Sequence, residues 1–229
     1  MCYNQLMTFH VVSLFPESFS SYLESSIIGR ALATKKIAVK FYNPRDFVAA
    51  KNKAGYKQVD DKAYGGGPGM VMQALPILKA VEKIKRSLKA DSRSMKTIIF
   101  SPSGQSFDNT LAEKVSKKTK HLVLICGRYE GVDARVKKIL RAEEWSVGPY
   151  VVTGGELPAL VVLDTITRRL PGVLGKDESV EERRVSSREV YTRPEVLAYG
   201  GKRYRVPPVL LSGNHKKIEE WKLAKVKTK

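Results

Sequence analysis

The chain has 229 residues, and its 41 Lys and Arg against 23 Asp and Glu leave a formal charge of +18 and a pI near 9.9. With 42% hydrophobic and 28% charged residues, the composition excludes a disordered chain and a membrane-spanning protein. No apolar run approaches the ~20 residues of a transmembrane helix, and the first residues lack the features of a signal peptide. Cys2 and Cys126 cannot build a disulfide framework, so we expect a reducing, cytoplasmic location.

The positive charge favours a polyanionic partner, because it exceeds the about 2–8 units typical of small domains. The basic residues are spread along the chain, with concentrations at 79–89 and 216–229, which indicates a folded body with a positive face. A helix that lies on a membrane surface needs apolar side chains opposite its charges, and only the last segment comes near that pattern. Nucleic acid is therefore the expected partner, and a solvated Lys-rich surface is the alternative.

In chain order, apolar and β-branched runs predict strands and the segments between them have helical spacing. The predicted strands are 9–15, 37–42, 98–100, 122–126 and 150–152. Helices are predicted from three apolar repeats, which are Ile77, Val81, Ile84 and Leu88 behind Pro76, then Phe107, Leu111 and Val115 behind a cap at Asp108 or Asn109, then Val132, Val136, Ile139 and Leu140. This alternation predicts an α/β domain with a mainly parallel sheet.

The pattern breaks near Gly172, and residues 176–188 are almost wholly polar. We therefore predict a domain over 7–174, a linker over 175–190 and a small C-terminal domain over 191–229 that ends in a helix around 218–226.

Three glycine clusters lie at 65–69, 127–131 and 148–155. None matches the spacing of a P-loop or of a dinucleotide-binding motif. Two of them adjoin predicted strands, and a third predicted strand runs into the loop 101–104. Ligands in open α/β sheets bind outside the carboxyl ends of the strands, where glycine lets the backbone approach closely. The three loops therefore predict a cleft for a small ligand, although single clusters of this kind are more often plain turns.

Several common chemistries have no support in the sequence. Cys126 ends an apolar run, which is typical of a core residue rather than a nucleophile, and the three histidines lack metal-ligand spacing, so no metal is expected. The charged residues near the glycine loops are Arg128, Glu130, Asp133, Glu156, Asp164 and Arg168. Carboxylates beside arginines are ordinarily ion pairs, and Glu156 and Asp164 share a face if their segment is helical.

Taken together, the motifs show that the chain closely resembles the bacterial tRNA (guanine-N1-)-methyltransferase family, the TrmD type of the SPOUT superfamily. The resemblance runs from Met7 to about Trp221 through SLFP at 13–16, NPRDF at 43–47, VDD at 59–61, YGGGPGM at 64–70, CGRYEG at 126–131, EWS at 144–146, TGGELPA at 153–159, PGVLG at 171–175, YTRPEV at 191–196 and VPPVL at 206–210. Each motif alone is weak, but their number and order are specific.

The resemblance implies a deep trefoil knot in the α/β domain and a small, mostly helical C-terminal domain that binds tRNA and completes the tRNA groove. It implies that the knot loops bind S-adenosyl-L-methionine and that two chains form a homodimer whose active sites are shared. The substrate implied is N1 of guanosine at tRNA position 37. The implied cofactor-binding residues are Ser101, Pro102, Gly127, Val147, Gly148, Pro149, Tyr150, Val151, Val152, Gly154, Gly155 and Pro158.

The family chemistry assigns roles to a few charged residues. Arg168 matches the arginine that stabilises negative charge on O6 as N1 loses its proton. Glu130 matches an acidic residue that helps to hold the target base, and Arg128 lies in the same loop. Arg183 occupies the linker position that holds the catalytic Asp in the family. Because a guanidinium stays protonated, Arg183 cannot accept the proton from N1. We therefore predict Glu182 as the base, with Glu181 and Glu189 in reserve.

Other departures from the family pattern are smaller. Pro149 stands where the cofactor loop usually has Asp and removes one amide donor. Residues 1–6 precede the usual start, the stretch before Tyr191 is about four residues shorter than usual, and the C-terminal domain ends early. Two alternatives stay open at this point: another knotted RNA methyltransferase, or an RNA-binding protein that has lost catalysis.

Overall fold

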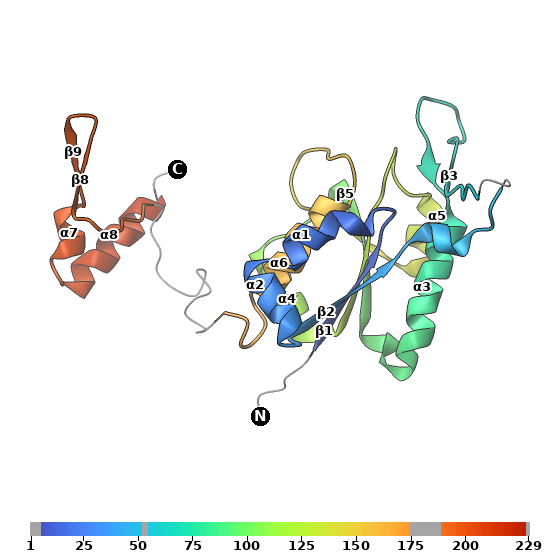
Figure 1. The fold of residues 1–229 in the computed structure, drawn as a ribbon, viewed down its shortest axis with the longest axis horizontal. Helices are drawn as coiled ribbons and strands as arrows, with labels where there is room; N and C mark the ends of the chain where they lie inside the picture. The colour runs from blue at the N-terminus through green and yellow to red at the C-terminus, as the bar shows by residue number, and fades with distance from the viewer. Residues whose placement is uncertain (1–5, 52–54, 175–188, 228–229) are drawn as a thin grey trace. The chain divides into compact units, whose positions relative to one another are not determined.

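The computed structural model describes residues 6–51, 55–174 and 189–227. The chain divides into two compact units, the first ending at Leu174 and the second beginning at Gly175 (Figure 1). None of the helices in the described part of the chain has the length and apolar character that a membrane crossing requires.

A five-stranded parallel sheet forms the centre of the first unit. Its strands, in spatial order, are β2 (Ile37–Tyr42), β1 (Met7–Val12), β6 (His121–Ile125), β5 (Met95–Ser106) and β7 (Glu143–Ser146). Because all five run in the same direction, their carboxyl ends meet at one edge of the sheet. Near that edge β5 loses its register against β7 between Phe100 and Gln105, so residues 101–104 bulge outward.

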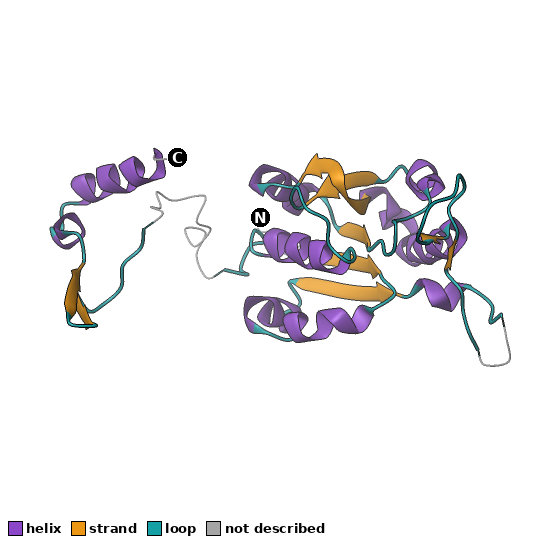
Figure 2. Ribbon diagram, turned by 90° about the horizontal axis from the view of Figure 1, so that it is seen from above, coloured by secondary structure: helices purple, strands orange, loops and turns teal. Residues whose placement is uncertain are grey.

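Helices cover both faces of this sheet (Figures 1 and 2). On one face lie α1 (Ser20–Leu23), α2 (Ser26–Ala33), α4 (Asn109–Lys118) and α6 (Glu156–Thr167), and on the other lie α3 (Ala74–Leu88) and α5 (Ala134–Leu140). Strand residues alternate between the two cores. In β6, Leu122 and Leu124 pack on the α6 side while Val123 and Ile125 pack on the α3 side. Both sheet faces are therefore buried, as a parallel sheet requires.

Short elements complete the first unit. They are the 3₁₀ helices at Pro16–Phe19, Pro44–Phe47 and Lys89–Ser94 and the antiparallel pair β3 (Asp60–Asp61) and β4 (Val71–Met72).

The second unit contains a β-hairpin of β8 (Val196–Tyr199) and β9 (Lys202–Arg205), followed by α7 (Pro208–Leu211) and α8 (His215–Lys227). The helix predicted around 218–226 is thus present and begins earlier. The hairpin was not predicted, although Gly200-Gly201 between two β-forming runs is a hairpin signal.

The predicted helices and four of the five predicted strands are confirmed. The Asp108 carboxylate caps α4 by accepting a hydrogen bond from the Leu111 amide at 2.7 Å. The strand predicted at 150–152 is wrong, because the last strand of the sheet is β7, which ends at Ser146. Trp145 anchors β7 with a fully buried indole, whereas Val151 lies 84% exposed in a loop.

Candidate active site

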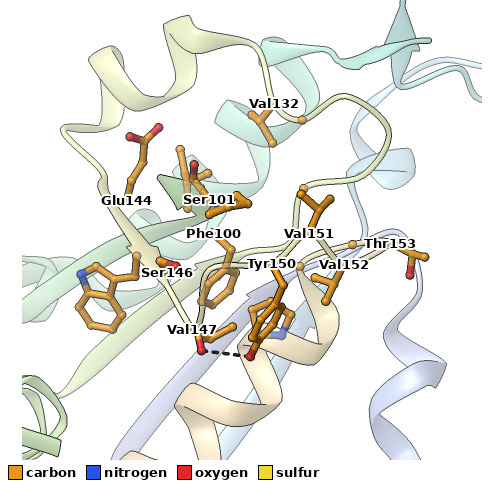
Figure 3. A pocket seen from close by; sticks show the side chains of 18 of the residues that line it. Phe100, Ser101, Val132, Glu144, Ser146, Val147, Tyr150, Val151, Val152 and Thr153 are labelled. Atoms are coloured by element: carbon orange, nitrogen blue, oxygen red, sulfur yellow. Dashed lines mark hydrogen bonds between the residues drawn. The ribbon is translucent and has the colours of Figure 1, made fainter. Parts of the chain in front are cut away.

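A pocket of about 410 Å³ opens at the carboxyl edge of the sheet. Its walls come from the ends of β5, β6 and β7 and from the start of α6, which are the strand-end loops that the glycine pattern indicated. Figure 3 shows the labelled side chains of the wall, among them Phe100, Val132 and Tyr150. Its size lies within the range of about 300–1,000 Å³ typical of sites for small ligands.

The structure brings together all but one of the residues expected to bind the cofactor. Those that line the pocket are Ser101, Pro102, Gly127, Val147, Gly148, Tyr150, Val151, Val152, Gly154, Gly155 and Pro158. Pro149 is exposed and does not line it. Glu130 lines the same pocket, so the residue expected to hold the target base lies beside the residues expected to hold the methyl donor.

The loop from Val147 to Gly154 forms one wall of the pocket. Its fold is local: the Tyr150 hydroxyl donates to the Val147 carbonyl at 3.1 Å (Figure 3), and the Ser146 hydroxyl donates to the Gly148 carbonyl at 2.9 Å. Within the described residues, the amides of Tyr150, Val151 and Val152 meet no protein acceptor. They can therefore donate to a bound ligand, which is the donor set that a polar cofactor with few side-chain contacts needs.

Glycine is required where this wall meets the sheet. Gly155 caps α6 and donates its amide to the Gly127 carbonyl at 2.9 Å. A Cβ atom at Gly155 would lie 2.6 Å from the Cα of Cys126, so the two backbones can approach only if the residue is glycine.

A buried ion pair connects the loops around the pocket. The Arg128 Nε lies 3.0 Å from Glu156 Oε2 and is held by charge rather than by an aligned hydrogen bond. The other Glu156 oxygen accepts from the Ser13 hydroxyl at 2.7 Å, and Arg128 also reaches the Thr153 carbonyl at 3.4 Å and lies 4.5 Å above the Phe15 ring. The Arg128–Glu156 pair therefore connects the loop after β1, the loop after β6 and the loop before α6.

Ser13 and Glu156 were not predicted as part of a network. Glu156 is only 4% exposed, and a buried carboxylate needs a partner. Its sequence signal was weak, because Ser13 and Glu156 are 143 residues apart and come together only through the fold.

The glycine-rich loop at 65–69 packs against Glu130. The Glu130 amide donates to the Met70 carbonyl at 2.9 Å. Because Gly69 has no side chain, it leaves room for the Glu130 carboxyl group. A Cβ at Gly69 would lie 2.6 Å from Glu130 Cγ and Oε1. The loop therefore sets the position of the Glu130 side chain at the rim of the pocket.

Arg168 lies apart from the pocket, as the residue that follows the last turn of α6. The pocket reaches Pro158 in the first turn of that helix, so ten residues, or about 15 Å along the axis, separate the two. Asp164 accepts a hydrogen bond from the Tyr22 hydroxyl at 2.7 Å, and Asp133 forms an ion pair with Arg135 at 2.6 Å. Neither carboxylate points to a role in the pocket.

The remaining candidates are settled by burial or lie outside the described residues. Cys126 is fully buried, and burial raises the pKa of its thiol well above the ordinary value, which confirms it as a core residue. Among the described residues, no three His, Cys, Asp or Glu side chains are grouped so that they could hold a metal ion. Glu182, Glu181 and Arg183 lie outside the described residues, and Glu189, at the start of the second described stretch, accepts from the Tyr191 hydroxyl at 3.0 Å.

The fold and the pocket together define an α/β protein with a pocket of small-ligand size, lined by glycine-containing loops at the carboxyl edge of a parallel sheet. The family model of tRNA (guanine-1)-methyltransferase TrmD matches residues 7–229. The chain belongs to that family.

Individual relatives agree with this assignment. A tRNA (guanine-N(1)-)-methyltransferase of Mannheimia succiniciproducens is 44% identical over 93% of this chain and 80% of its own length. One from Buchnera aphidicola (from Acyrthosiphon pisum) is 42% identical over 96% of this chain and 90% of its own length. The crystal structure of the tRNA (m1G37) methyltransferase of Aquifex aeolicus superposes with a TM-score of 0.74 at 39% identity, covering 95% of this chain and 88% of that one.

Proposed function

We propose that the protein transfers a methyl group from S-adenosyl-L-methionine to N1 of guanosine at position 37 of tRNA. The observation that carries the proposal is the pocket at the carboxyl edge of the sheet, where the loops of a tRNA methyltransferase family surround a site with unpaired amides and a neighbouring carboxylate. The charge of +18 favours a tRNA substrate, and a cytoplasmic location fits such a substrate.

The pocket residues fit S-adenosyl-L-methionine. The amides of Tyr150, Val151 and Val152 offer donors, Pro158 and Phe100 offer apolar surface, and Gly155 keeps the floor free of a side chain. When bound, the cofactor supplies a methyl group already activated by a sulfonium, so the protein has chiefly to orient the acceptor and to remove a proton.

The acceptor N1 carries a proton at neutral pH, and two kinds of side chain assist its loss. A carboxylate accepts the proton as the new bond forms, and a guanidinium stabilises the charge that develops on O6. We assign the second role to Arg168 and assign to Glu130 the holding of the base beside the pocket. Arg168→Ala should therefore slow single-turnover methyl transfer more than it weakens tRNA binding; an unchanged transfer rate would refute the role.

We assign the proton acceptor to Glu182. It directly precedes Arg183, whose charge would keep a neighbouring carboxylate ionised at neutral pH. Glu182→Gln should lose about 10²–10⁴-fold in single-turnover rate, whereas Glu181→Gln and Glu189→Gln should retain most of it. If all three variants keep the wild-type rate, the proton leaves by another route.

The distance between Arg168 and the pocket favours a homodimer. An arginine side chain cannot span about 15 Å, so Arg168 serves a pocket only if that pocket belongs to a second chain. The exposed side of α6 supports such contact, because Leu157 and Val161 lie one turn apart with 60% and 46% of their surface exposed.

Mixed dimers test this shared site. Arg168→Ala and Gly154→Val chains should each be inactive. The first lacks the guanidinium that we assign to O6, and the second places a side chain against Arg128 and Glu156. Mixing and reassociation should restore up to about a quarter of the wild-type activity, because half of the random dimers carry one intact site of two. No recovery in a preparation shown to contain mixed dimers would refute the shared site.

The transfer itself is tested with unmodified tRNA transcripts. Transcripts with guanosine at position 37 should accept a methyl group at N1, and transcripts with adenosine there should not. Methylation elsewhere in the same transcripts would instead indicate a different knotted RNA methyltransferase. A thermal shift with S-adenosyl-L-methionine, without methyl transfer, would indicate a chain that has kept its pocket and lost catalysis.

A further inference from the structure

The β8–β9 hairpin of the second unit is a short two-stranded ribbon. Gly200 and Gly201 form its turn with φ values of +58° and +72°, the left-handed pair of a two-residue turn whose twist matches the strands. The strands pair Val196 with Arg205 and Tyr199 with Lys202, so the register is fixed along their whole length. In Figure 1 the ribbon projects away from α7 and α8.

The pairing gives the ribbon two different faces. Residues opposite each other in a hairpin point to the same side, and neighbours along a strand alternate. Leu197, Tyr204, Tyr199 and Lys202 therefore share one side, which we call the aromatic face. The opposite face meets α7 at the base of the ribbon, where Arg205 lines a small pocket with Pro208 and Leu211.

The aromatic face is open. Tyr199 is 77% exposed, and Tyr204 and Leu197 are each 54% exposed. Single exposed apolar side chains are ordinary, but three of them on one face of a two-stranded ribbon are not, because such a ribbon is marginally stable without something packed on it.

The charge of the ribbon identifies what covers this face. Lys202, Arg203 and Arg205 lie within residues 196–205, which contain no acidic residue. Flat tyrosine rings beside cations bind unpaired nucleotides, since the bases stack on the rings and the phosphates meet the positive charge. Paired bases cannot do this, because their faces are covered by their neighbours in the helix.

We propose that the aromatic face binds unpaired nucleotides of the substrate tRNA by stacking on Tyr199 and Tyr204. This inference rests on the proposed function for the identity of the RNA. The proposal names the residues through which the second unit would contact tRNA, in addition to the contact at the pocket of the first unit. It makes the hairpin a determinant of tRNA affinity rather than of the chemical step.

Binding of an unmodified tRNA transcript to the full chain tests the stacking. Tyr199→Ala and Tyr204→Ala should each weaken binding by about 5- to 100-fold, the worth of one base stacked on an aromatic ring. Tyr199→Phe and Tyr204→Phe should bind like the wild type, because they keep the ring. Single-turnover methyl transfer at saturating tRNA should be unchanged in all four variants.

Lys202 and Arg203 provide a matched pair, because both are exposed cations of one strand but lie on opposite faces. Lys202→Gln should weaken tRNA binding more than Arg203→Gln does, and it should lower the salt dependence of binding by the share of about one phosphate contact. Equal effects of the two variants would mean that the ribbon acts only through its charge.

A competition experiment separates unpaired from paired RNA. A single-stranded oligoribonucleotide should compete with tRNA less well against the Tyr199→Ala variant than against the wild type, whereas an RNA duplex of equal length should compete equally against both. Alanine variants that bind tRNA within twofold of the wild type, phenylalanine variants as weak as alanine, or a change of oligomeric state in place of tRNA affinity would overturn the proposal. The binding and competition measurements need no methyl transfer, so a chain that binds tRNA through the hairpin but methylates nothing would contradict the proposed function alone.

Discussion

At the scale of single residues, the site depends on where a side chain is missing as much as on where one is present. Glu156 is a buried carboxylate that forms an ion pair with Arg128 and accepts a hydrogen bond from Ser13, and Gly155 supplies the space that lets two backbones meet beside it. Removing one member of a buried pair leaves an uncompensated charge, which is costly. The loops that form the pocket walls are therefore held in place by the interactions of Glu156 with Arg128 and Ser13.

Gly69 and Gly67 allow the position of Glu130 to be tested at constant backbone strain. Both have positive φ, +91° and +103°, but a Cβ at Gly67 meets nothing within 4 Å while a Cβ at Gly69 collides with the Glu130 carboxyl group. Gly69→Ala should therefore lower the rate of single-turnover methyl transfer at least about tenfold further than Gly67→Ala. A small displacement of Glu130, which we propose holds the base, is enough to slow the reaction that strongly.

S-adenosyl-L-methionine affinity is the control for this pair. It should stay within about twofold of the wild type in both variants, because Gly69 does not line the cofactor pocket. Equal rates in the two variants would show that the position of Glu130 does not limit transfer.

His10 makes stability depend on pH. It is fully buried, with Nε2 3.2 Å from His121 Nδ1 and Nδ1 3.3 Å from the Tyr42 hydroxyl. Burial, and then the positive charges of His121 and Lys40, lower its pKa from 6.5 to about 4. Because the folded state binds the proton less well, stability is complete above pH 6.5 and falls as the pH drops toward 4, by about 2 kcal/mol between pH 7 and pH 5.

Denaturant unfolding at several pH values measures this effect. His10→Gln should remove most of the loss of stability between pH 7 and pH 5 but not all of it, since burial also lowers the pKa of His121. His215→Gln, in the exposed first turn of α8, should leave the slope as it is. A His10→Gln chain with the wild-type slope would mean that His10 does not cause it.

At the scale of elements, α6 has two tasks that explain its composition. Its first turn forms part of the pocket, its core side packs on the sheet through Val162 and Ile166, and its outer side still carries Leu157 and Val161. A helix that is apolar almost all round is buried on nearly every side. The described residues of one chain do not cover its outer side, which is why a second chain is proposed there.

Leu157 and Leu75 give a matched test of that surface, because each is 60% exposed, one on α6 and one on α3. Leu157→Glu should dissociate the proposed dimer and abolish methyl transfer, since it places charges in the proposed apolar interface and separates Arg168 from the pocket that we propose it serves. Leu75→Glu should leave both properties unchanged. Sedimentation and transcript methylation measure the two effects, and a fully active monomeric Leu157→Glu chain would contradict the dimer.

At the scale of the whole molecule, the charge of +18 governs affinity for tRNA rather than the chemistry. We expect the logarithm of the tRNA affinity to fall with the logarithm of salt with a slope steeper than about −3, because each neutralised phosphate releases a counterion. Affinity for S-adenosyl-L-methionine, bound by backbone amides and apolar side chains, should hardly change over the same range. A slope near zero for tRNA would rule out a phosphate-dominated interface.

Much of the scaffold could be predicted because it depends on local patterns. The β-branched runs of β1, β2 and β6 and the apolar repeat of α3 are periodic, and periodicity reports which side of a segment is buried. Glycine next to those runs indicated where the pocket opens. The deep knot and the role of Arg168 came from family resemblance, and the role of Glu182 was inferred from the acidic residues that remain beside Arg183; all three stay predictions.

The tertiary structure decided what periodicity cannot report. Residues 150–152 have the composition of a strand, yet the place at the edge of the sheet is filled by β7, whose polar Glu143 and Glu144 hid the strand around Trp145. The side chains of residues 150–152 line a wall of the pocket instead. Likewise, the contacts of Glu156 with Ser13 and of Glu130 with Gly69 join residues far apart in sequence. A sequence pattern records how each segment meets water, whereas a site is made by segments that meet each other.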